Sequence, residues 1–243
     1  MKDQYVGDIN DYRKYALLRA LSAGGANRLG VCWMLTESDG GNHGGRLGYL
    51  EQPERYRHFD PQLFDALAHV AAEPEQRSVR VIEASGVLPG ALFHSDLLPQ
   101  SPDERARYMA ECRERFAAAD IVFFDPDNGI EVPSTRVGLK SALRYVFLEE
   151  IAAVYADGKA VLIYQHFPIR QHRAPFITAR IAQLRAIPPD ASVWAFTTAH
   201  VVFLLLVHPD SPERLALAAA DACSRWHHSF VRGEQIDAAS GND

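Results

Sequence analysis

The sequence predicts an α/β fold: a three-layer, Rossmann-like, mostly parallel sheet with a terminal antiparallel hairpin strand. Three observations predict it. Short apolar runs alternate along the chain with amphipathic stretches of helical spacing. The runs VFF, VLIY and FLLLV are apolar at successive positions, which is typical of strands that are covered on both faces. Finally, two apolar runs near the C-terminus follow each other almost directly, which predicts a hairpin.

The helices are recognised by their end signals as well as by their spacing. In the first, Asp8 or Asn10 is the N-cap and Gly24-Gly25 is the stop. Asp60-Pro61 and Ser101-Pro102 open later helices, because proline is favoured at the first helical position. The expected helices cover residues 8–23, 60–72, 101–119, 141–155, 174–186 and 211–226.

Strands are expected where apolar runs end in polar or glycine-containing segments. The run DIVFFDPDNG is the clearest of them, because a wholly apolar stretch leads directly into a polar turn. The final two runs, SVWAFTTAH and VVFLLLVHP, form the hairpin, so the last strand is expected to be antiparallel. The expected strands cover residues 30–36, 79–84, 91–98, 120–129, 158–167, 192–200 and 201–209.

Composition narrows the class of protein. With 243 residues and no internal repeat or linker, we expect one domain over 1–236, the helix at 8–23 packed on it, and a disordered tail at 237–243. A net charge of −6 excludes binding of nucleic acid through overall basicity. Three cysteines exclude a disulfide framework and a four-cysteine zinc site, so a cytoplasmic location is expected. No apolar leader or membrane-length run is present, and no membrane partner is expected.

In an open parallel sheet, ligands bind beyond the carboxyl ends of the strands, and this rule selects the candidate residues. They follow four of the expected strands and should converge on one crevice. In chain order they are Thr36, Asp39, Gly40, Gly41, Glu83, Asp125, Asp127, Asn128, Glu131, Gln165 and His166.

The turn Asp125-Pro126-Asp127-Asn128-Gly129 is the sharpest signal, because one Asp and the Gly would be enough for a turn alone. The glycines at 40–41 and 44–45 would allow a ligand to approach the backbone, although a plain surface loop would read the same and the pattern is not G-x-G-x-x-G. Glu83 is expected at a strand end, where a carboxylate could accept hydrogen bonds from ribose hydroxyls. The alternative is that it is a lone strand-end Glu with no binding role. His166 is a ligand, a base or a buried histidine.

Positive charge is concentrated next to these residues. Residues 164–185 hold four arginines and no acid, and Arg170 and Arg173 follow Gln165 and His166 closely. Such a stretch would meet the phosphates of a nucleic acid or another phosphate-bearing substrate. A solvated helix face balanced by acids elsewhere explains it equally well.

The layout resembles the class I S-adenosylmethionine-dependent methyltransferase fold, whose final strands form a hairpin with one antiparallel member and whose fourth strand ends in an acidic turn. It is similar in particular to the J-type large-subunit ribosomal RNA adenine methyltransferases. Those begin with a helical G-N-x-x-D-x-x-K-H pattern, and this chain reads Gly7-Asp8-Ile9-Asn10-Asp11-Tyr12-Arg13-Lys14-Tyr15. Asp8 and Tyr15 stand in place of the Asn and the His.

The resemblance implies S-adenosylmethionine as cofactor, with Asp11 and Lys14 near it and Asp125 orienting the target group. Thr36, Asp39, Gly40, Gly41 and Glu83 would complete the cofactor site, Asp127, Asn128 and His166 the catalytic site, and Gln165, Arg170 and Arg173 would meet the substrate. Two departures are visible. The loop after the first strand lacks a G-x-G core, and Asp127 and Asn128 replace the second proline and the aromatic of the usual D-P-P-Y turn.

Two further functions remain open. Asp125, Asp127, Glu131 and His166, with Asp39 or His43, are hard oxygen and imidazole ligands suited to Mg²⁺ or Mn²⁺, which would indicate a metal-dependent nuclease or phosphodiesterase. A binding module that kept the fold without catalysis is the third possibility.

Overall fold

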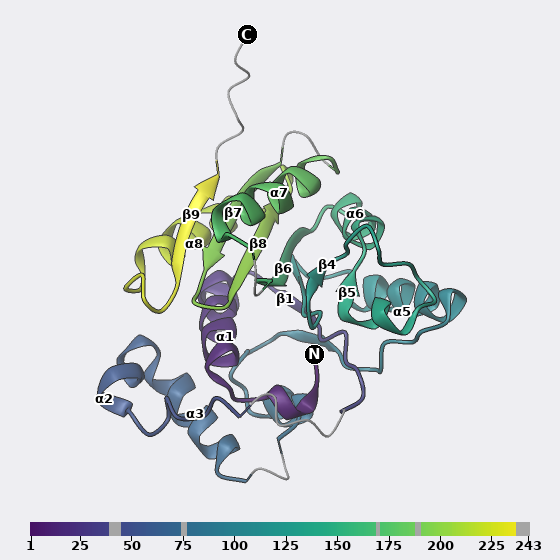
Figure 1. The fold of residues 1–243 in the computed structure, drawn as a ribbon. Helices are drawn as coiled ribbons and strands as arrows, with labels where there is room; N and C mark the ends of the chain where they lie inside the picture. The colour runs from purple at the N-terminus through teal and green to yellow at the C-terminus, as the bar shows by residue number, and fades with distance from the viewer. Residues whose placement is uncertain (39–44, 74–76, 169–170, 188–190, 237–243) are drawn as a thin grey trace.

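The computed structural model describes residues 1–38, 45–73, 77–168, 171–187 and 191–236 (Figure 1). One seven-stranded mixed sheet dominates them, in the spatial order β2-β1-β3-β6-β8-β7-β9. The first four of these strands are parallel, whereas β8, β7 and β9 are each antiparallel to the strand before them in that order. Their bounds are β1 Leu29–Cys32, β2 Leu92–His94, β3 Ile121–Phe124, β6 Ala160–His166, β7 Ser192–Thr197, β8 Val201–Val207 and β9 Arg232–Ile236.

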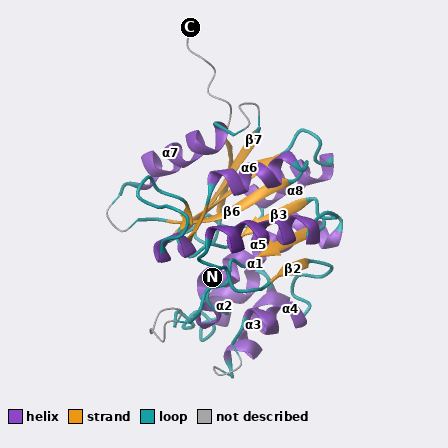
Figure 2. Ribbon diagram, turned by 90° about the vertical axis from the view of Figure 1, so that its right-hand side faces the viewer, coloured by secondary structure: helices purple, strands orange, loops and turns teal. Residues whose placement is uncertain are grey.

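Helices cover both faces of the sheet, so the three-layer α/β prediction is confirmed (Figure 2). One face packs on α1 (Ile9–Ser22), α3 (Pro61–Ala71), α4 (Val79–Ala84) and α8 (Glu213–Ser224). The other packs on α5 (Pro102–Arg115), α6 (Leu148–Ala156) and α7 (Arg173–Arg185). The short α2 (Pro53–Tyr56) precedes α3. No helix of the described ranges is both long and apolar enough to cross a membrane.

Helix α1 begins at the predicted N-cap, Asp8, and ends at Ser22, just before the predicted Gly24-Gly25 stop. The carboxylate of Asp8 accepts the backbone N–H groups of Asn10 and Asp11, and the helix ends where Ala23 adopts a left-handed conformation (φ 47°). The helix is buried on nearly every side, including its charged residues Asp11 and Lys14. Charged side chains this deep in a protein need partners, and these partners form the candidate site described below.

Two predicted elements are wrong. Residues 79–84 are not a strand but helix α4, which places Val79 and Ile82 on one face against the core. The neighbour of β1 is instead β2, from the stretch predicted at 91–98. The expected helix at 141–155 begins only at Leu148; before it lie a 3₁₀ turn at Lys140–Arg144 and the strand β5 (Tyr145–Val146), which pairs with β4 (Gly129–Ile130). Here the guanidinium of Arg105 binds the carbonyls of Ala142 and Tyr145, a tertiary contact that overrides local helical spacing.

The edge strand β9 has no counterpart among the predicted strands. Its sequence, RGEQI, lacks an apolar alternation because a strand at a sheet edge is only partly buried. The predicted tail at 237–243 lies outside the described residues.

Close packing of β1 against α5 gives a test of the fold. Gly30 lies in β1, and a Cβ atom there would be 2.6 Å from Cγ of the buried Phe116 ring. We expect Gly30→Ala to lower the free energy of unfolding by about 1–3 kcal/mol, as overpacking does in close-packed cores. Gly48→Ala is the matched control, since nothing lies within 4 Å of its added Cβ. Urea unfolding of both variants checks this, and equal stabilities would contradict the packing described.

Candidate functional site

A cavity of about 390 Å³ opens at the carboxyl ends of β3 and β6, next to the first turns of α1. Its volume falls within the range of about 300–1,000 Å³ that small-molecule sites occupy. The lining residues are mostly polar and come from segments far apart in the chain. They are Met1, Lys2, Tyr5, Asp8, Asn10, Asp11, Lys14, Arg46, Asp125, Pro126, Asp127, Asn128, Arg144, Tyr164 and His166.

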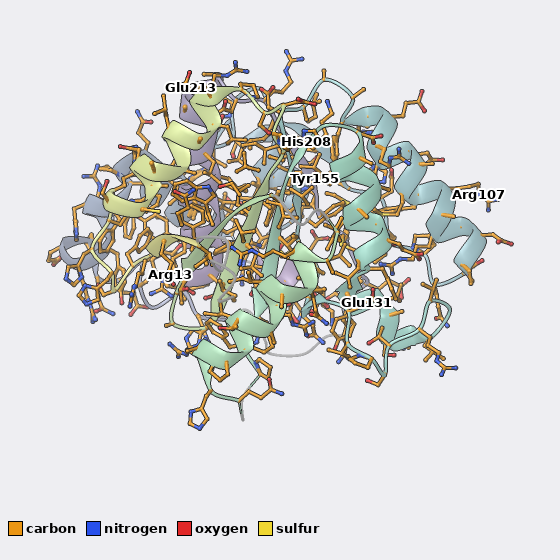
Figure 3. The ribbon with its side chains drawn as sticks, turned by 90° about the horizontal axis from the view of Figure 1, so that it is seen from above. Arg13, Arg107, Glu131, Tyr155, His208 and Glu213 are labelled. Atoms are coloured by element: carbon orange, nitrogen blue, oxygen red, sulfur yellow. The ribbon has the colours of Figure 1, made fainter. Side chains whose placement is uncertain are left out.

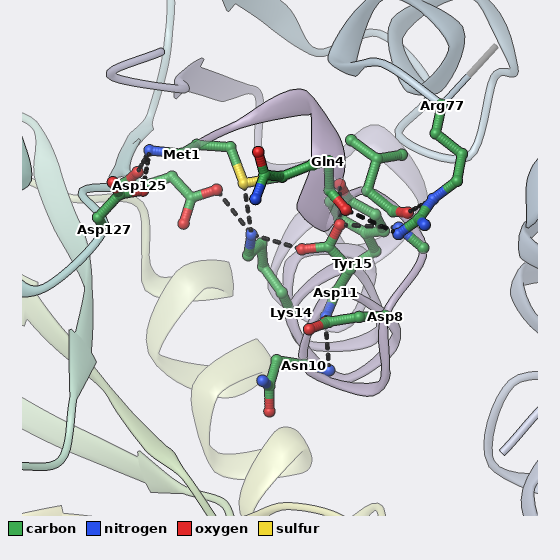
Figure 4. A network of polar contacts seen from close by, with 12 residues as sticks. Met1, Gln4, Asp8, Asn10, Asp11, Lys14, Tyr15, Arg77, Asp125 and Asp127 are labelled. Atoms are coloured by element: carbon green, nitrogen blue, oxygen red, sulfur yellow. Dashed lines mark hydrogen bonds and ion pairs between the residues drawn. The ribbon is translucent and has the colours of Figure 1, made fainter. Parts of the chain in front are cut away.

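Lys14 connects two carboxylates in the wall of this cavity (Figure 4). Its Nζ lies 2.7 Å from Oδ1 of Asp11, one turn earlier in α1, and 2.6 Å from Oδ2 of Asp125, directly after β3. The side chains of all three are 2–3% exposed. Burial alone would lower the pKa of Lys14, but the two carboxylates outweigh it and raise that pKa, so the ammonium stays charged. Burial raises the pKa of Asp125, while the charges of Lys14 and the N-terminal amino group act to lower it.

The second oxygen of Asp11 is held as firmly as the first. Its Oδ2 accepts hydrogen bonds from the backbone N–H of Gly7 (3.0 Å) and from the hydroxyl of Tyr15 (3.1 Å). Burial and the charges of Asp11 and Asp125 raise the pKa of Tyr15, so its hydroxyl remains a donor. Tyr15 therefore orients Asp11 toward Lys14.

The amino group of Met1 completes the inner wall. It donates to the carbonyls of Met34 (3.2 Å) and Asp125 (3.0 Å) and lies 3.0 Å from Oδ1 of Asp127. Met34 itself has φ +46°, which is uncommon for a residue with a side chain, and its conformation turns the carbonyl after β1 toward this site. The Asp125-Pro126-Asp127 turn is thus anchored at both of its carboxylates.

The side chain of Gln165, on β6, holds the Asp125–Gly129 turn in place. Its amide nitrogen donates to the carbonyls of Asn128 and His166, and its Oε1 accepts from the N–H of Ile130. Gly129 (φ +122°) passes directly over this side chain, where any Cβ would overlap the amide. Gly129 is therefore required by close packing on β6 as well as by the turn.

Asp8 differs from the other three carboxylates of the wall. It is 8% exposed, and within the described residues no lysine, arginine or histidine nitrogen lies within ion-pair distance of it. Burial and the negative charge of Asp11 raise its pKa to about 6, although two backbone hydrogen bonds and the charge of Lys14 act to lower it.

The structure brings together six of the sequence-predicted site residues. Asp125, Asp127, Asn128 and His166 line the cavity, as the strand-end rule predicts. Asp11 and Lys14, which only the family resemblance placed there, line it too.

Other predicted residues lie elsewhere. Glu83 is not at a strand end; on α4 it accepts the indole N–H of Trp33 (2.9 Å). The backbone N–H and the hydroxyl of Thr36 donate to the carbonyl of Met1, and Gln165 lies beneath the turn. Arg173 is on α7, over the ring of Phe167, and bonds the carbonyl of Ala199. The expectations for Asp39, Gly40, Gly41, His43 and Arg170 fall outside the described residues.

Several lining residues had no sequence signal. Arg144 was expected inside a helix, and Arg46 follows the glycine-rich loop without a motif of its own. Asp8 was recognised only as an N-cap, because its exposure and the lack of an ion pair emerge only from tertiary structure.

The predicted metal ligands that the structure describes do not form one set. Glu131 lies on the side of the sheet that carries α6, away from Arg13 of α1 (Figure 3), and its Oε1 accepts the N–H of Leu148 at the start of α6. Asp125 is committed to Lys14. Over the residues that the structure describes, no group of three or more His, Cys, Asp or Glu side chains is arranged to hold a metal ion.

Comparison with known proteins does not assign the chain to a family. No protein-family model matches the chain, and no curated protein matches it significantly in sequence.

The Lys14 cluster predicts a large effect on stability. Lys14→Met leaves Asp11 and Asp125 buried without a counter-charge, and removing one partner of a buried ion pair costs about 3–5 kcal/mol. We expect guanidinium unfolding to show a loss of that size, and the double variant Lys14→Met/Asp125→Asn to recover part of it. Strictly additive losses in the two single variants and the double variant would show that the groups are not coupled.

The raised pKa of Asp8 predicts that Asp8→Asn stabilises the protein by an amount that depends on pH. A carboxyl whose pKa is raised from 3.8 to about 6 on folding stabilises the fold fully below about pH 4 and loses that contribution as the pH rises through about 6. Asp8→Asn stays neutral and can still cap α1. We expect it to exceed the wild type by about 2–3 kcal/mol above pH 7 and to equal it near pH 4, measured by urea unfolding. Asp65→Asn, in an exposed ion pair, is the control, and a gain that is the same at every pH would refute the argument.

Proposed function

We propose that the chain is an S-adenosylmethionine-dependent methyltransferase that acts in the cytoplasm on a phosphate-bearing substrate such as a nucleic acid. One observation carries the proposal. In the wall of one cavity, Nζ of Lys14 lies 2.7 Å from the carboxylate of Asp11, on the same helix, and 2.6 Å from that of Asp125 in the acidic turn after β3. The family resemblance implies this juxtaposition, between positions 111 residues apart.

The arrangement of strands supports the same proposal. The sheet has seven strands, β7 and β8 form a hairpin, and β8 runs antiparallel to its neighbour β6. The acidic turn follows a central parallel strand, where ligands of open α/β sheets bind. The three cysteines are free, as expected of a protein in a reducing compartment.

The cavity suits a ligand that carries both signs of charge. Its lining offers the carboxylates of Asp8 and Asp127 as well as the cations of Arg46 and Arg144. S-adenosylmethionine has a carboxylate, an ammonium and a sulfonium, and when bound it supplies a methyl group on an already reactive sulfur.

The work left to the protein is alignment and exclusion of water. Lys14 holds Oδ2 of Asp125, and among the described residues no hydrogen bond reaches Oδ1. That oxygen is placed to accept a hydrogen bond from an amine or hydroxyl of the substrate. Because Lys14 and the Met1 amino group fix the carboxylate and its backbone, Asp125 needs little reorganisation to do so.

Positive charge at the rim supports a phosphate-bearing substrate. Burial, followed by the charges of Arg46, Arg13, His166 and Arg173, lowers the pKa of His200. Of the arginines that act on His200, Arg46 lines the cavity, and Arg144 lines it as well. Phosphate groups are the anions that such arginines commonly hold.

A thermal-shift measurement tests the proposal. With EDTA present, S-adenosylmethionine and its demethylated product should each raise the melting temperature. At a hundredfold excess over the dissociation constant, the added free energy of unfolding would be about 2.7 kcal/mol. Mg²⁺ alone should have no such effect. The failure of both compounds to shift the transition would overturn the proposal.

A second arm separates an enzyme from a binding module. Incubation with cofactor labelled in its methyl group and with total RNA, DNA or protein should label a nucleic acid, and Asp125→Asn should abolish labelling. Asp65→Asn, far from the cavity and exposed, should leave it unchanged. Cofactor binding without any labelled acceptor would indicate the binding module.

A further inference from the structure

The carboxylate of Asp8 is held in a defined orientation. A single oxygen, Oδ1, accepts both backbone hydrogen bonds, from Asn10 at 2.8 Å and from Asp11 at 2.9 Å. No hydrogen bond from the described parts of the chain reaches Oδ2, and Asp8 lines the cavity. The N-cap interaction therefore uses one oxygen and leaves the other for a ligand.

The inner wall of the cavity holds more negative than positive charge. Its four carboxylates are those of Asp8, Asp11, Asp125 and Asp127. Lys14 is shared by Asp11 and Asp125, and the amino group of Met1 lies against Asp127. Both internal cations are thus committed to carboxylates other than Asp8.

The remaining charged groups around Asp8 do not neutralise it. Lys2, Arg46, Arg144 and His166 line the cavity, and Arg13 lies on α1 with its guanidinium over the ring of Phe230. In the described ranges none of them is within ion-pair distance of Asp8. Its carboxylate therefore has no ion-pair partner among the described residues, and burial together with the negative charge of Asp11 raises its pKa to about 6.

We infer that Asp8 is the anionic contact for a cationic group of the ligand, a sulfonium or an ammonium, so that the cavity selects ligands that carry a positive charge at this point. The inference rests on the proposed function and extends it to a residue that departs from the family pattern, which has Asn there. An Asn would cap α1 equally well, so capping alone does not require a carboxylate. A buried, uncompensated carboxylate costs stability, and a bound cation would offset that cost.

The inference predicts that ligand binding expels a proton from Asp8. Titration calorimetry of S-adenosylmethionine in buffers of different ionisation enthalpy should show release of about half a proton near pH 6, where Asp8 is half protonated. Affinity should fall about tenfold per pH unit below pH 6, since only ionised Asp8 binds the cation. Asp8→Asn should weaken binding about tenfold or more at neutral pH and abolish this proton release.

Three controls make the result specific. Asp60→Asn changes another N-cap, that of α3, and should leave affinity and proton release unchanged. His166→Gln shows whether the imidazole in the cavity contributes to the pH profile; if Asp8 is responsible, the profile survives. Mg²⁺ titrated alone should not bind in a manner that depends on Asp8.

The outcomes separate the two proposals. If S-adenosylmethionine binds to neither the wild type nor Asp8→Asn, the proposed function fails. If both bind it with equal affinity and the same pH profile, the methyltransferase proposal stands and the role of Asp8 is refuted. Binding of Mg²⁺ that Asp8→Asn abolishes would overturn the inference in favour of a metal site.

Discussion

The ion pairs of Lys14 with Asp11 and Asp125 are the interaction on which the rest of the site depends. They join α1, near the start of the chain, to the end of a central strand more than a hundred residues later. Three ionic groups buried together cost desolvation energy that apolar residues would not, so such a cluster contributes little net stability. What it does provide is one defined position of α1 on the sheet. The cavity exists because that position brings the polar first turn of α1 against the strand ends.

The sheet explains why the other half of the site is where it is. Parallel β3 and β6 end at the same edge, which places Asp125 and His166 side by side. The next strand in the sheet, β8, runs antiparallel to β6, because the chain reverses direction in the β7–β8 hairpin. Its carboxyl end therefore lies at the opposite edge of the sheet. The side-chain amide of Gln165 then holds the acidic turn on β6: it donates to the carbonyl of Asn128 and accepts from the N–H of Ile130, and Gly129 packs directly against it. The backbone of the turn is thus held on β6 by Gln165, while its two carboxylates are held by the ammonium of Lys14 and the amino group of Met1.

Sequence alone predicted the fold and the strand-end half of the site, because apolar periodicity and the strand-end rule act locally. Asp125 and His166 could be found in this way. Asp11 and Lys14 were reachable only through a motif, since their partner is distant in sequence. Glu83 was misplaced because the short V-R-V alternation fits a strand and one helical turn equally well, and only packing decides between them. Arg144 and the exposure of Asp8 depend on tertiary contacts that leave no periodic signature.

The net charge of the chain does not describe the charge inside the cavity. The value of −6 is a sum over the whole chain, and it does not show that the lining of the cavity brings four carboxylates together with the arginines Arg46 and Arg144. Under the proposed function, a ligand would place its cationic group against Asp8 and its anionic group near Arg46 and Arg144. Such an arrangement discriminates by sign along the length of a ligand, because a misplaced charge would meet an uncompensated like charge at low exposure. The proposed recognition therefore rests on where each charge lies in the lining, with Asp8 as the carboxylate that no cation of the described residues pairs with.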